Sequence, residues 1–259
     1  MTPAIIIGLA WIIFGGSHLL LSALNLRERW SHRVSPQGFT LLFTVVTCVT
    51  MSLLIFAVAM FGDKGIGGPS MGQYGPARII LIILSSLGGF LAIAGLINYP
   101  KSPMAVLARR QRGQNKNKPL RPSSSIERVS RHPFFTGLAI LMTAHTLLAQ
   151  TLAGAVYFAG FVVLAIVGIP LQDRKLRKRW QHTYTGFENS TSVGPFTPSK
   201  QHKAPDKIEW KPWLFAGVAT MFLLDVLHPI WTIANGGLFA VFILMFGLGG
   251  VLWAQVVSK

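Results

Sequence analysis

The sequence predicts an all-α membrane protein: one domain over residues 1–259, built as a bundle of about seven transmembrane helices. Hydrophobic residues make up 51% of the chain and charged residues only 12%, whereas soluble domains carry about 25% charged residues. Stretches free of Asp, Glu, Lys and Arg reach the roughly 20 residues that a helix needs to cross a bilayer. These stretches do not alternate between polar and apolar residues, so helices rather than barrel strands are expected to satisfy the backbone in lipid. A soluble enzyme and a disordered chain are excluded.

The first three spans are separated by short polar segments. They cover about residues 4–24, 39–61 and 77–99. The basic stretch 25–38 between the first two is expected to be a loop, because it holds three arginines and a proline.

The later spans need to be divided. The apolar stretch 132–172 is too long for one helix and divides at Gln150-Thr151 into about 134–149 and 152–171. The last two spans, about 213–231 and 237–257, are separated by the turn signal Ala234-Asn235-Gly236.

The basic residues predict the orientation. Of 24 Lys and Arg, 22 fall in residues 25–38, 100–133 and 172–212 or at Lys259, and the other side of the bundle has only Lys64 and Arg78. Because positively charged loops stay in the cytosol, the N-terminus is predicted outside and the C-terminus inside, in a bacterial inner membrane or its equivalent. The net charge of +16 therefore reports orientation and contact with membrane lipids, and no nucleic-acid partner is expected.

The segment after the fifth span has two interpretations. Leu176 and Trp180 recur among basic residues at the spacing of one helical turn, which is typical of a helix that continues along the membrane surface. The alternative, which the charge pattern favours, is a simple stop-transfer signal. The single cysteine, Cys48, excludes a disulfide within the chain and a cysteine metal cluster.

A few ionisable residues fall within the predicted spans, where they are functional candidates by default. His18 follows Phe14-Gly15-Gly16-Ser17, and His145 lies between Ala144 and Thr146. Small neighbours leave room for a second helix or a flat ligand. Each imidazole can therefore form an interhelical hydrogen bond or bind a metal or haem iron, and two histidines on two helices can hold one haem. Their predicted depths differ, however, by several ångströms.

Asp225 and His228 share one face of the predicted sixth span. They can act as a catalytic acid–base pair, or they can form a buried structural contact beside Pro229. Asp225 and His228 are the catalytic candidates of the sequence.

Arg131-His132-Pro133 opens the fourth span, with the proline suited to the first helical turn. Free N–H groups at a helix start attract anions, and an arginine adds a bidentate contact. Arg131 and His132 are therefore candidates to bind a haem propionate, a lipid phosphate or a cofactor carboxylate. The alternative is a capping turn beside an arginine that reaches the membrane surface.

Several of these motifs together resemble the NnrU family and its plant and cyanobacterial relative, 15-cis-zeta-carotene isomerase. The matching segments occur in the family's order along the chain: Ser17-His18-Leu19, Arg128–Pro133, Gly137, Ala144-His145, Asp173–Leu176, Ser190–Phe196 and Leu227-His228-Pro229. The isomerase has a further histidine in its fifth span, and residues 153–171 here have none.

The resemblance implies b-type haem held by histidines and a redox-gated cis-to-trans change of one double bond in a carotenoid. Carried over by position, His18 and His145 are the expected ligands of the haem iron, with His228 and His132 in reserve. The expected partners are a lipophilic polyene that enters from the bilayer and an electron donor.

Two alternatives stay open. Arg131-His132-Pro133 with Thr136-Gly137, followed by Trp180 and Tyr184, is also similar to the isoprenylcysteine carboxyl methyltransferases, which bind S-adenosylmethionine. In those enzymes two glutamates follow the next helix, where this chain has Gln172-Asp173. The second alternative is a non-catalytic haem protein of the NnrU type, linked to denitrification.

Overall fold

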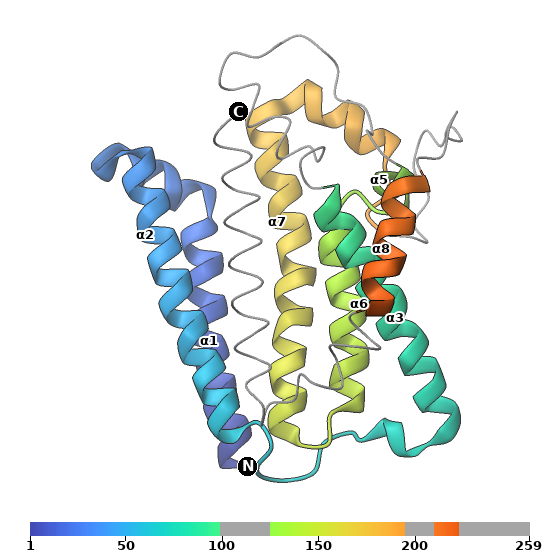
Figure 1. Cartoon of the computed structure of the whole chain (residues 1–259). Coiled ribbons are helices and arrows are strands. Elements are labelled where there is room, and N and C mark those ends of the chain that lie inside the picture. Colours follow the sequence, from blue (N-terminus) through green and yellow to red (C-terminus); the bar gives the residue numbers. More distant parts are fainter. Residues whose placement is uncertain (99–124, 195–209, 223–259) are drawn as a thin grey trace.

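The computed structural model describes residues 1–98, 125–194 and 210–222, and within these ranges the chain is helical (Figure 1). An isolated antiparallel pairing of Gly67 with Thr151 accompanies the helices. The elements in chain order are α1 (Thr2–Ser22), α2 (Leu24–Phe61), the short 3-10 helix η1 (Met71–Gln73), α3 (Gly75–Ile97), α5 (Ser125–Val129), α6 (Pro133–Leu148), α7 (Leu152–Ser190) and α8 (Trp210–Phe222).

Within the described residues, four segments are long and apolar enough to cross a membrane: Thr2–Ser22, Gly38–Phe61, Gly75–Ile97 and Leu152–Lys178. They confirm the helical fold class and agree with the first, second, third and fifth predicted spans. The fourth, α6, is apolar but has only 16 residues, about 24 Å of helix at 1.5 Å per residue. Most of the predicted spans 213–231 and 237–257 lies outside the described residues, so the count of seven and the orientation stay predictions.

The basic stretch 25–38 is helical, and the expectation of a loop there is wrong. α1 ends at Ser22, and α2 starts at Leu24 and contains one non-helical residue, Ser35, with φ 67° and ψ 158°. Pro36 disfavours helical geometry for the residue before it, which explains why the helix breaks at Ser35. The Ser35 hydroxyl accepts a hydrogen bond from the Gly38 N–H at 3.1 Å, so it caps the membrane-crossing part of α2.

α7 also extends beyond its prediction. It was expected to leave the membrane near residue 171, and it stays helical to Ser190 with a break at Gln181, where φ is 29° and ψ is −111°. Helix therefore continues past the basic run, as the surface-helix interpretation predicted. In Figure 1 the part after the break turns away from the axis of α7 and lies across the end of the bundle.

Small residues set the helix contacts. A side chain at Gly88 of α3 would overlap the backbone of Leu141, and one at Gly137 of α6 would overlap the backbone of Ala92, so α3 and α6 touch backbone to backbone. Gly160 of α7 lies directly under the ring of Trp11 of α1, whose indole N–H donates to the Tyr157 carbonyl at 3.0 Å.

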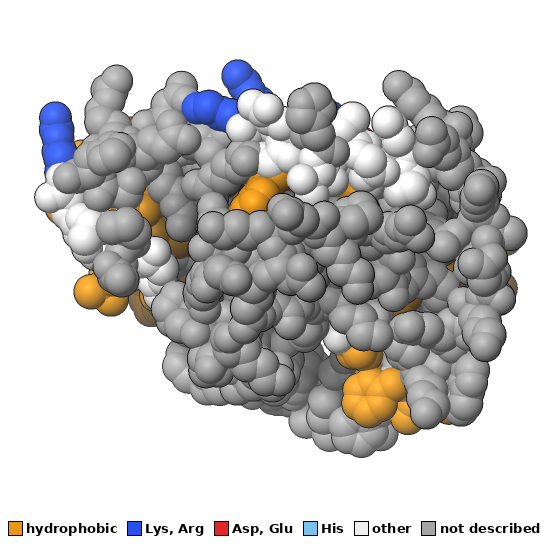
Figure 2. All heavy atoms as spheres, turned by 90° about the horizontal axis from the view of Figure 1, so that it is seen from above, with side chains coloured by type: hydrophobic (Ala, Val, Ile, Leu, Met, Phe, Trp, Pro, Cys, Tyr) orange, Lys and Arg blue, Asp and Glu red, His pale blue; other side chains and the backbone are white. Residues whose placement is uncertain are grey.

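Two ends of the bundle are used below as references. The turn end is the end at which residues 149–151 connect α6 and α7. The loop 62–70 is hydrogen-bonded to this connection: Gly68 N–H donates to Gln150 O at 2.8 Å, and the Thr151 hydroxyl donates to Gly62 O at 2.6 Å. The predicted division at Gln150-Thr151 is thus confirmed. The basic end carries Arg174, Lys175, Arg177 and Lys178 of α7; Figure 2 looks onto it and shows Lys and Arg side chains at its rim.

Candidate functional site

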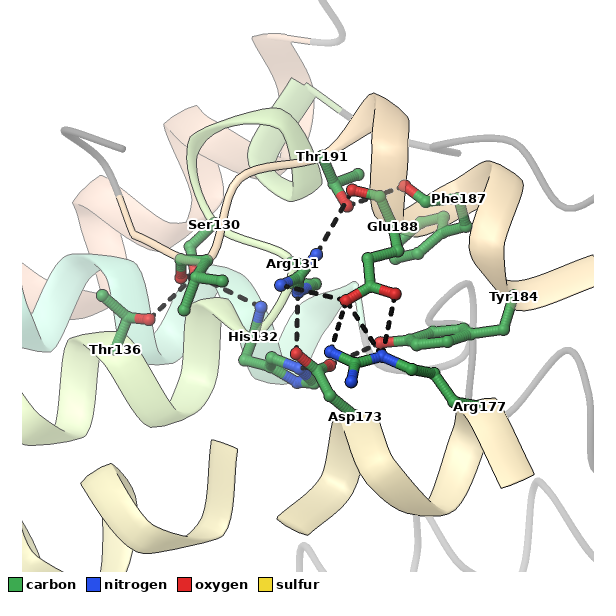
Figure 3. Close-up of polar contacts among 11 residues, drawn as sticks. Ser130, Arg131, His132, Thr136, Asp173, Arg177, Tyr184, Phe187, Glu188 and Thr191 are labelled. Carbon is green, nitrogen blue, oxygen red and sulfur yellow. Dashed lines mark hydrogen bonds and ion pairs between the residues drawn. The ribbon is translucent and has the colours of Figure 1, made fainter. Parts of the chain in front are cut away.

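A buried polar cluster lies at the basic end, around Asp173 (Figure 3). We call it the Asp173 cluster. Its members come from the start of α6 and from both parts of α7: Ser130, Arg131, His132, Thr136, Asp173, Arg177, Tyr184 and Glu188. His132 is the residue directly before α6, and Pro133 occupies its first turn. The break at Gln181 lets Tyr184 return over Asp173, eleven residues earlier in the same helix.

Asp173 is the centre of this cluster and is only 3% exposed. One carboxylate oxygen accepts hydrogen bonds from His132 Nε2 at 2.6 Å and from the Tyr184 hydroxyl at 2.5 Å. The other oxygen lies 3.1 Å from Arg131 Nε in an ion pair. A buried carboxylate is costly unless it is paired and hydrogen-bonded, and here three side chains supply that compensation.

Glu188 forms a second acidic position in the cluster. It binds Arg177 through both carboxylate oxygens, with contacts of 2.6 Å and 2.9 Å, and it lies 3.6 Å from Arg131. Two arginines therefore face two carboxylates, and the charges balance within the cluster. Arg131, a predicted anion-binding residue, is bound by acids of its own chain.

Backbone groups complete the cluster. The Ser130 hydroxyl contacts the Thr136 hydroxyl at 2.8 Å and donates to Val193 O at 2.8 Å, and Arg131 N–H donates to Ser192 O at 2.7 Å. These bonds tie the segment after α7 to the start of α6. Burial and the hydrogen bond to Asp173 raise the pKa of Tyr184 above its ordinary value, so its hydroxyl stays protonated and donates.

His18 lies on α1, with its ring centre 5.8 Å from that of Phe14 and 5.1 Å from that of Phe43 on α2. Its Nδ1 atom is buried and, among the described residues, has no hydrogen-bond partner. Unpaired buried polar atoms are rare and call for an explanation. A side chain added at Gly16, two residues before it, would meet nothing within 4 Å.

His145 lies near the turn end of α6, with its ring centre 5.2 Å from that of Phe158 on α7. Its Nδ1 lies 2.9 Å from the carbonyl oxygen of Leu141, one helical turn earlier. A carbonyl only accepts, so this contact assigns the hydrogen to Nδ1 and leaves the lone pair on Nε2. That tautomer is the one in which a histidine binds a metal through Nε2 while its other nitrogen is held by a hydrogen bond.

The structure does not bring His18 and His145 together at one depth. The Trp11 indole bonds to the Tyr157 carbonyl, and Phe158, which follows Tyr157 on α7, contacts His145. Trp11 and His145 therefore lie at about the same depth in the bundle. His18 lies seven residues beyond Trp11 on α1, about 10 Å nearer the basic end at 1.5 Å per residue. Two axial nitrogens on one iron lie only about 4 Å apart, given metal–imidazole bonds near 2 Å. The pair therefore does not fit one iron, whereas either histidine alone can serve.

The other predicted residues divide into two groups. Arg131 and His132 are brought together, on Asp173. Asp225 and His228, the catalytic candidates, lie outside the described residues. Sequence reasoning did not predict Asp173, Tyr184 and Glu188 as partners of Arg131 and His132. The resemblances had singled out Asp173–Leu176 and Tyr184, but as motif positions and not as contacts.

The comparison with protein families gives one match. A family profile described as NnrU protein covers residues 6–254, almost the whole chain. No curated protein and no solved structure matched the chain.

Proposed function

The chain belongs to the NnrU family, and we propose that it is a membrane-embedded, b-type haem enzyme that isomerises a cis double bond in a lipophilic polyene. The substrate class is a carotenoid such as 15-cis-zeta-carotene. The observation that carries the proposal is His145: its Nδ1 lies 2.9 Å from Leu141 O, which fixes the tautomer in which a histidine binds iron through Nε2.

The residues fit the cofactor through one protein ligand. A haem is held by one or two protein side chains, and His145 would supply one in the required tautomer. When bound, the haem supplies a redox-active iron that can pass electron density to a polyene and so lower the barrier to rotation about a double bond. His228, the reserve candidate on the predicted sixth span, would be the second histidine that could hold the haem.

The chain's own residues would position and shelter the site. Ala144 is fully buried, and Phe158 lies against the imidazole, so His145 is held among apolar groups. The Asp173 cluster fixes the start of α6 against α7 and thereby orients the helix that carries His145. In this proposal Arg131 and His132 position α6, and Asp225 and His228 stay the catalytic candidates of the sequence, outside the described residues.

The S-adenosylmethionine alternative has less support. An S-adenosylmethionine carboxylate at Arg131 would have to displace Asp173, at 3.1 Å, and Glu188, at 3.6 Å, from the same guanidinium. Displacing them would take from the buried Asp173 carboxylate its ion pair with Arg131, which is unfavourable.

The test of the proposed function combines a cofactor assay and a reaction. The full chain is purified in detergent after expression with ample haem supply, and its haem is quantified as the pyridine haemochrome. The protein is then incubated with a 15-cis polyene under dithionite, and the isomers are separated by liquid chromatography. We expect stoichiometric b-type haem and cis-to-trans conversion that requires the reductant. A protein without haem, or one whose haem does not promote conversion, would refute the proposal.

A further inference from the structure

We propose that the basic end of the bundle binds the headgroups of anionic phospholipids through exposed arginines of α2 and α7. The partner is a lipid whose phosphodiester charge is not balanced within its own headgroup, such as phosphatidylglycerol, in the leaflet that meets this end. The interaction needs no haem, so it is independent of the proposed function.

The first observation is the basic face that α7 turns outward beyond the apolar part of the helix. Arg174, Arg177 and Lys178 follow one another at spacings of three and four residues, and all three are exposed, so they share one side of the helix. Leu176, in contrast, is only 4% exposed and belongs to an apolar cluster with Tyr184. The apolar side chains of this stretch therefore pack inside the protein, and the basic ones face its surroundings.

The second observation is the depth of this basic face. α7 begins at the turn end with Leu152, and Arg174 lies 22 residues further along the helix, about 33 Å at 1.5 Å per residue. The hydrocarbon core of a bilayer is about 30 Å thick, and the headgroup layers bring the total to about 40–45 Å. With the turn end at one boundary of the core, Arg174 lies among the headgroups at the other boundary.

α2 presents a further arginine at the same end. α1 starts beside the loop 62–70, since a Cβ added at Gly65 would lie 3.2 Å from the Pro3 ring, so α1 ends and α2 begins at the basic end. Arg33 and Trp30 precede the membrane-crossing part of α2, and both are exposed. Tryptophan is enriched where the hydrocarbon core meets the headgroups. Arg33 is therefore placed at headgroup depth as well.

The third observation concerns the charges at this end. Among the described residues, no carboxylate forms an ion pair with Arg33 or Arg174, whereas Arg177 is bound by both oxygens of Glu188. Figure 2 shows Lys and Arg side chains at the edge of the basic end, and the edge of a helix bundle is where it meets lipid. Anionic headgroups attract basic residues at a membrane surface, so the exposed arginines favour anionic over zwitterionic lipid.

A lipid suits these positions better than a soluble anion does. The arginines are exposed, and an isolated phosphate ion would have to bind through exposed charges alone, which interact weakly in water. The acyl chains of a phospholipid lie in the bilayer beside α2 and α7, and they hold the phosphate at the depth of the arginines.

The experiment compares lipid binding to the purified full chain in detergent by native mass spectrometry. Dioleoyl phosphatidylglycerol and dioleoyl phosphatidylcholine are titrated in separate arms, and the apparent Kd of the first bound lipid is measured in each. We expect wild type to bind phosphatidylglycerol more tightly. The double substitution Arg33→Gln and Arg174→Gln should weaken this binding at least fivefold, the factor that about 1 kcal/mol for one basic residue near a membrane surface gives. Its phosphatidylcholine binding should not change.

Two further variants separate position from net charge. Lys64→Gln with Arg78→Gln removes two exposed charges from the turn end, and this matched control should bind phosphatidylglycerol as wild type does. Arg33→Lys with Arg174→Lys keeps both charges and should retain most of the binding. Because all four side chains are exposed, thermal unfolding in detergent should stay near the wild-type value in each variant.

Equal phosphatidylglycerol binding by wild type and the double glutamine variant at the basic end would overturn the proposal. An equal loss in the turn-end control would also overturn it, because net charge alone would then account for the effect. Excess sn-glycerol 3-phosphate should leave the bound lipid in place. Displacement of the lipid by this soluble phosphate would mean an anion site and not a lipid-binding surface.

Discussion

At the residue scale, the Asp173 carboxylate is the centre of the buried polar cluster. In a buried site it accepts hydrogen bonds from His132 Nε2 and the Tyr184 hydroxyl, and it forms an ion pair with the Arg131 guanidinium. A buried polar group left without a partner destabilises the fold by more than its hydrogen bond stabilises it. The stability of the whole cluster therefore depends on the Asp173 side chain.

Substitutions around Asp173 should therefore differ in severity. Tyr184→Phe removes one hydrogen bond to a charged group and should cost about 1.5–3 kcal/mol. Asp173→Leu leaves Arg131 buried beside Glu188 alone and should cost about 3–5 kcal/mol, as for other broken buried ion pairs. Thermal unfolding in detergent measures both.

Thr143→Ala is the control for these two variants, because its exposed hydroxyl bonds only within its own helix, to Ala139 O. It should change stability little. If Asp173→Leu proves as stable as Thr143→Ala, the cluster does not hold α6 against α7.

The sequence predicts part of this site. Arg131 and His132 stand out because an Arg-His-Pro run at a helix start is chemically distinctive. Their partners do not, since Tyr184 reaches Asp173 only because α7 breaks at Gln181, where no proline or glycine marks the break. The tautomer of His145 depends on a backbone contact, which no sequence pattern reports.

At the scale of elements, the contact between α3 and α6 depends on glycines. A Cβ at Gly88 would overlap the Leu141 backbone, which cannot rotate aside as a side chain can. We expect Gly88→Ala to destabilise the protein by about 1–3 kcal/mol, the usual cost of overpacking.

Gly75 offers a matched control on the same helix, because a Cβ there would meet nothing within 4 Å. Gly75→Ala should leave thermal unfolding in detergent near the wild-type value. Equal unfolding temperatures for Gly88→Ala and Gly75→Ala would mean that α3 and α6 are not in backbone contact.

Element boundaries follow the sequence where backbone chemistry marks them. The division at Gln150-Thr151 is confirmed, since Thr151 caps α7 by accepting a bond from Gly154 N–H at 3.0 Å. The helical stretch 25–38 was missed, because arginines there indicate the membrane side but do not prevent a helix. Composition therefore located the apolar segments better than it located the ends of the helices.

At the scale of the whole molecule, the count of seven spans with the N-terminus outside is testable by alkaline phosphatase fusions in a bacterial host. Fusions after residues 68, 150 and 235 should be active, and fusions after residues 115, 200 and 259 should be inactive. The reason is the concentration of 22 of 24 basic residues on one side.

An active fusion after residue 200 together with an inactive one after residue 150 would mean that the orientation is the opposite of the predicted one. Equal activities of the fusions after residues 200 and 235 would mean that no span lies between these two positions. Hydrophobic length and charge bias are properties of the chain as a whole, which is why the fold class was predicted from sequence while the pairing of the helices was not.

The central claim is that His145 binds haem iron, and the most direct measurement is the reduced-minus-oxidised absorption spectrum of the purified full chain and its histidine variants. We expect a b-type spectrum that His145→Ala abolishes or converts to a different ligation state. His18→Ala should leave it unchanged, as should His182→Ala and His202→Ala, whose histidines lie in the basic stretch 172–212. A native spectrum in His145→Ala would contradict the assignment of this ligand.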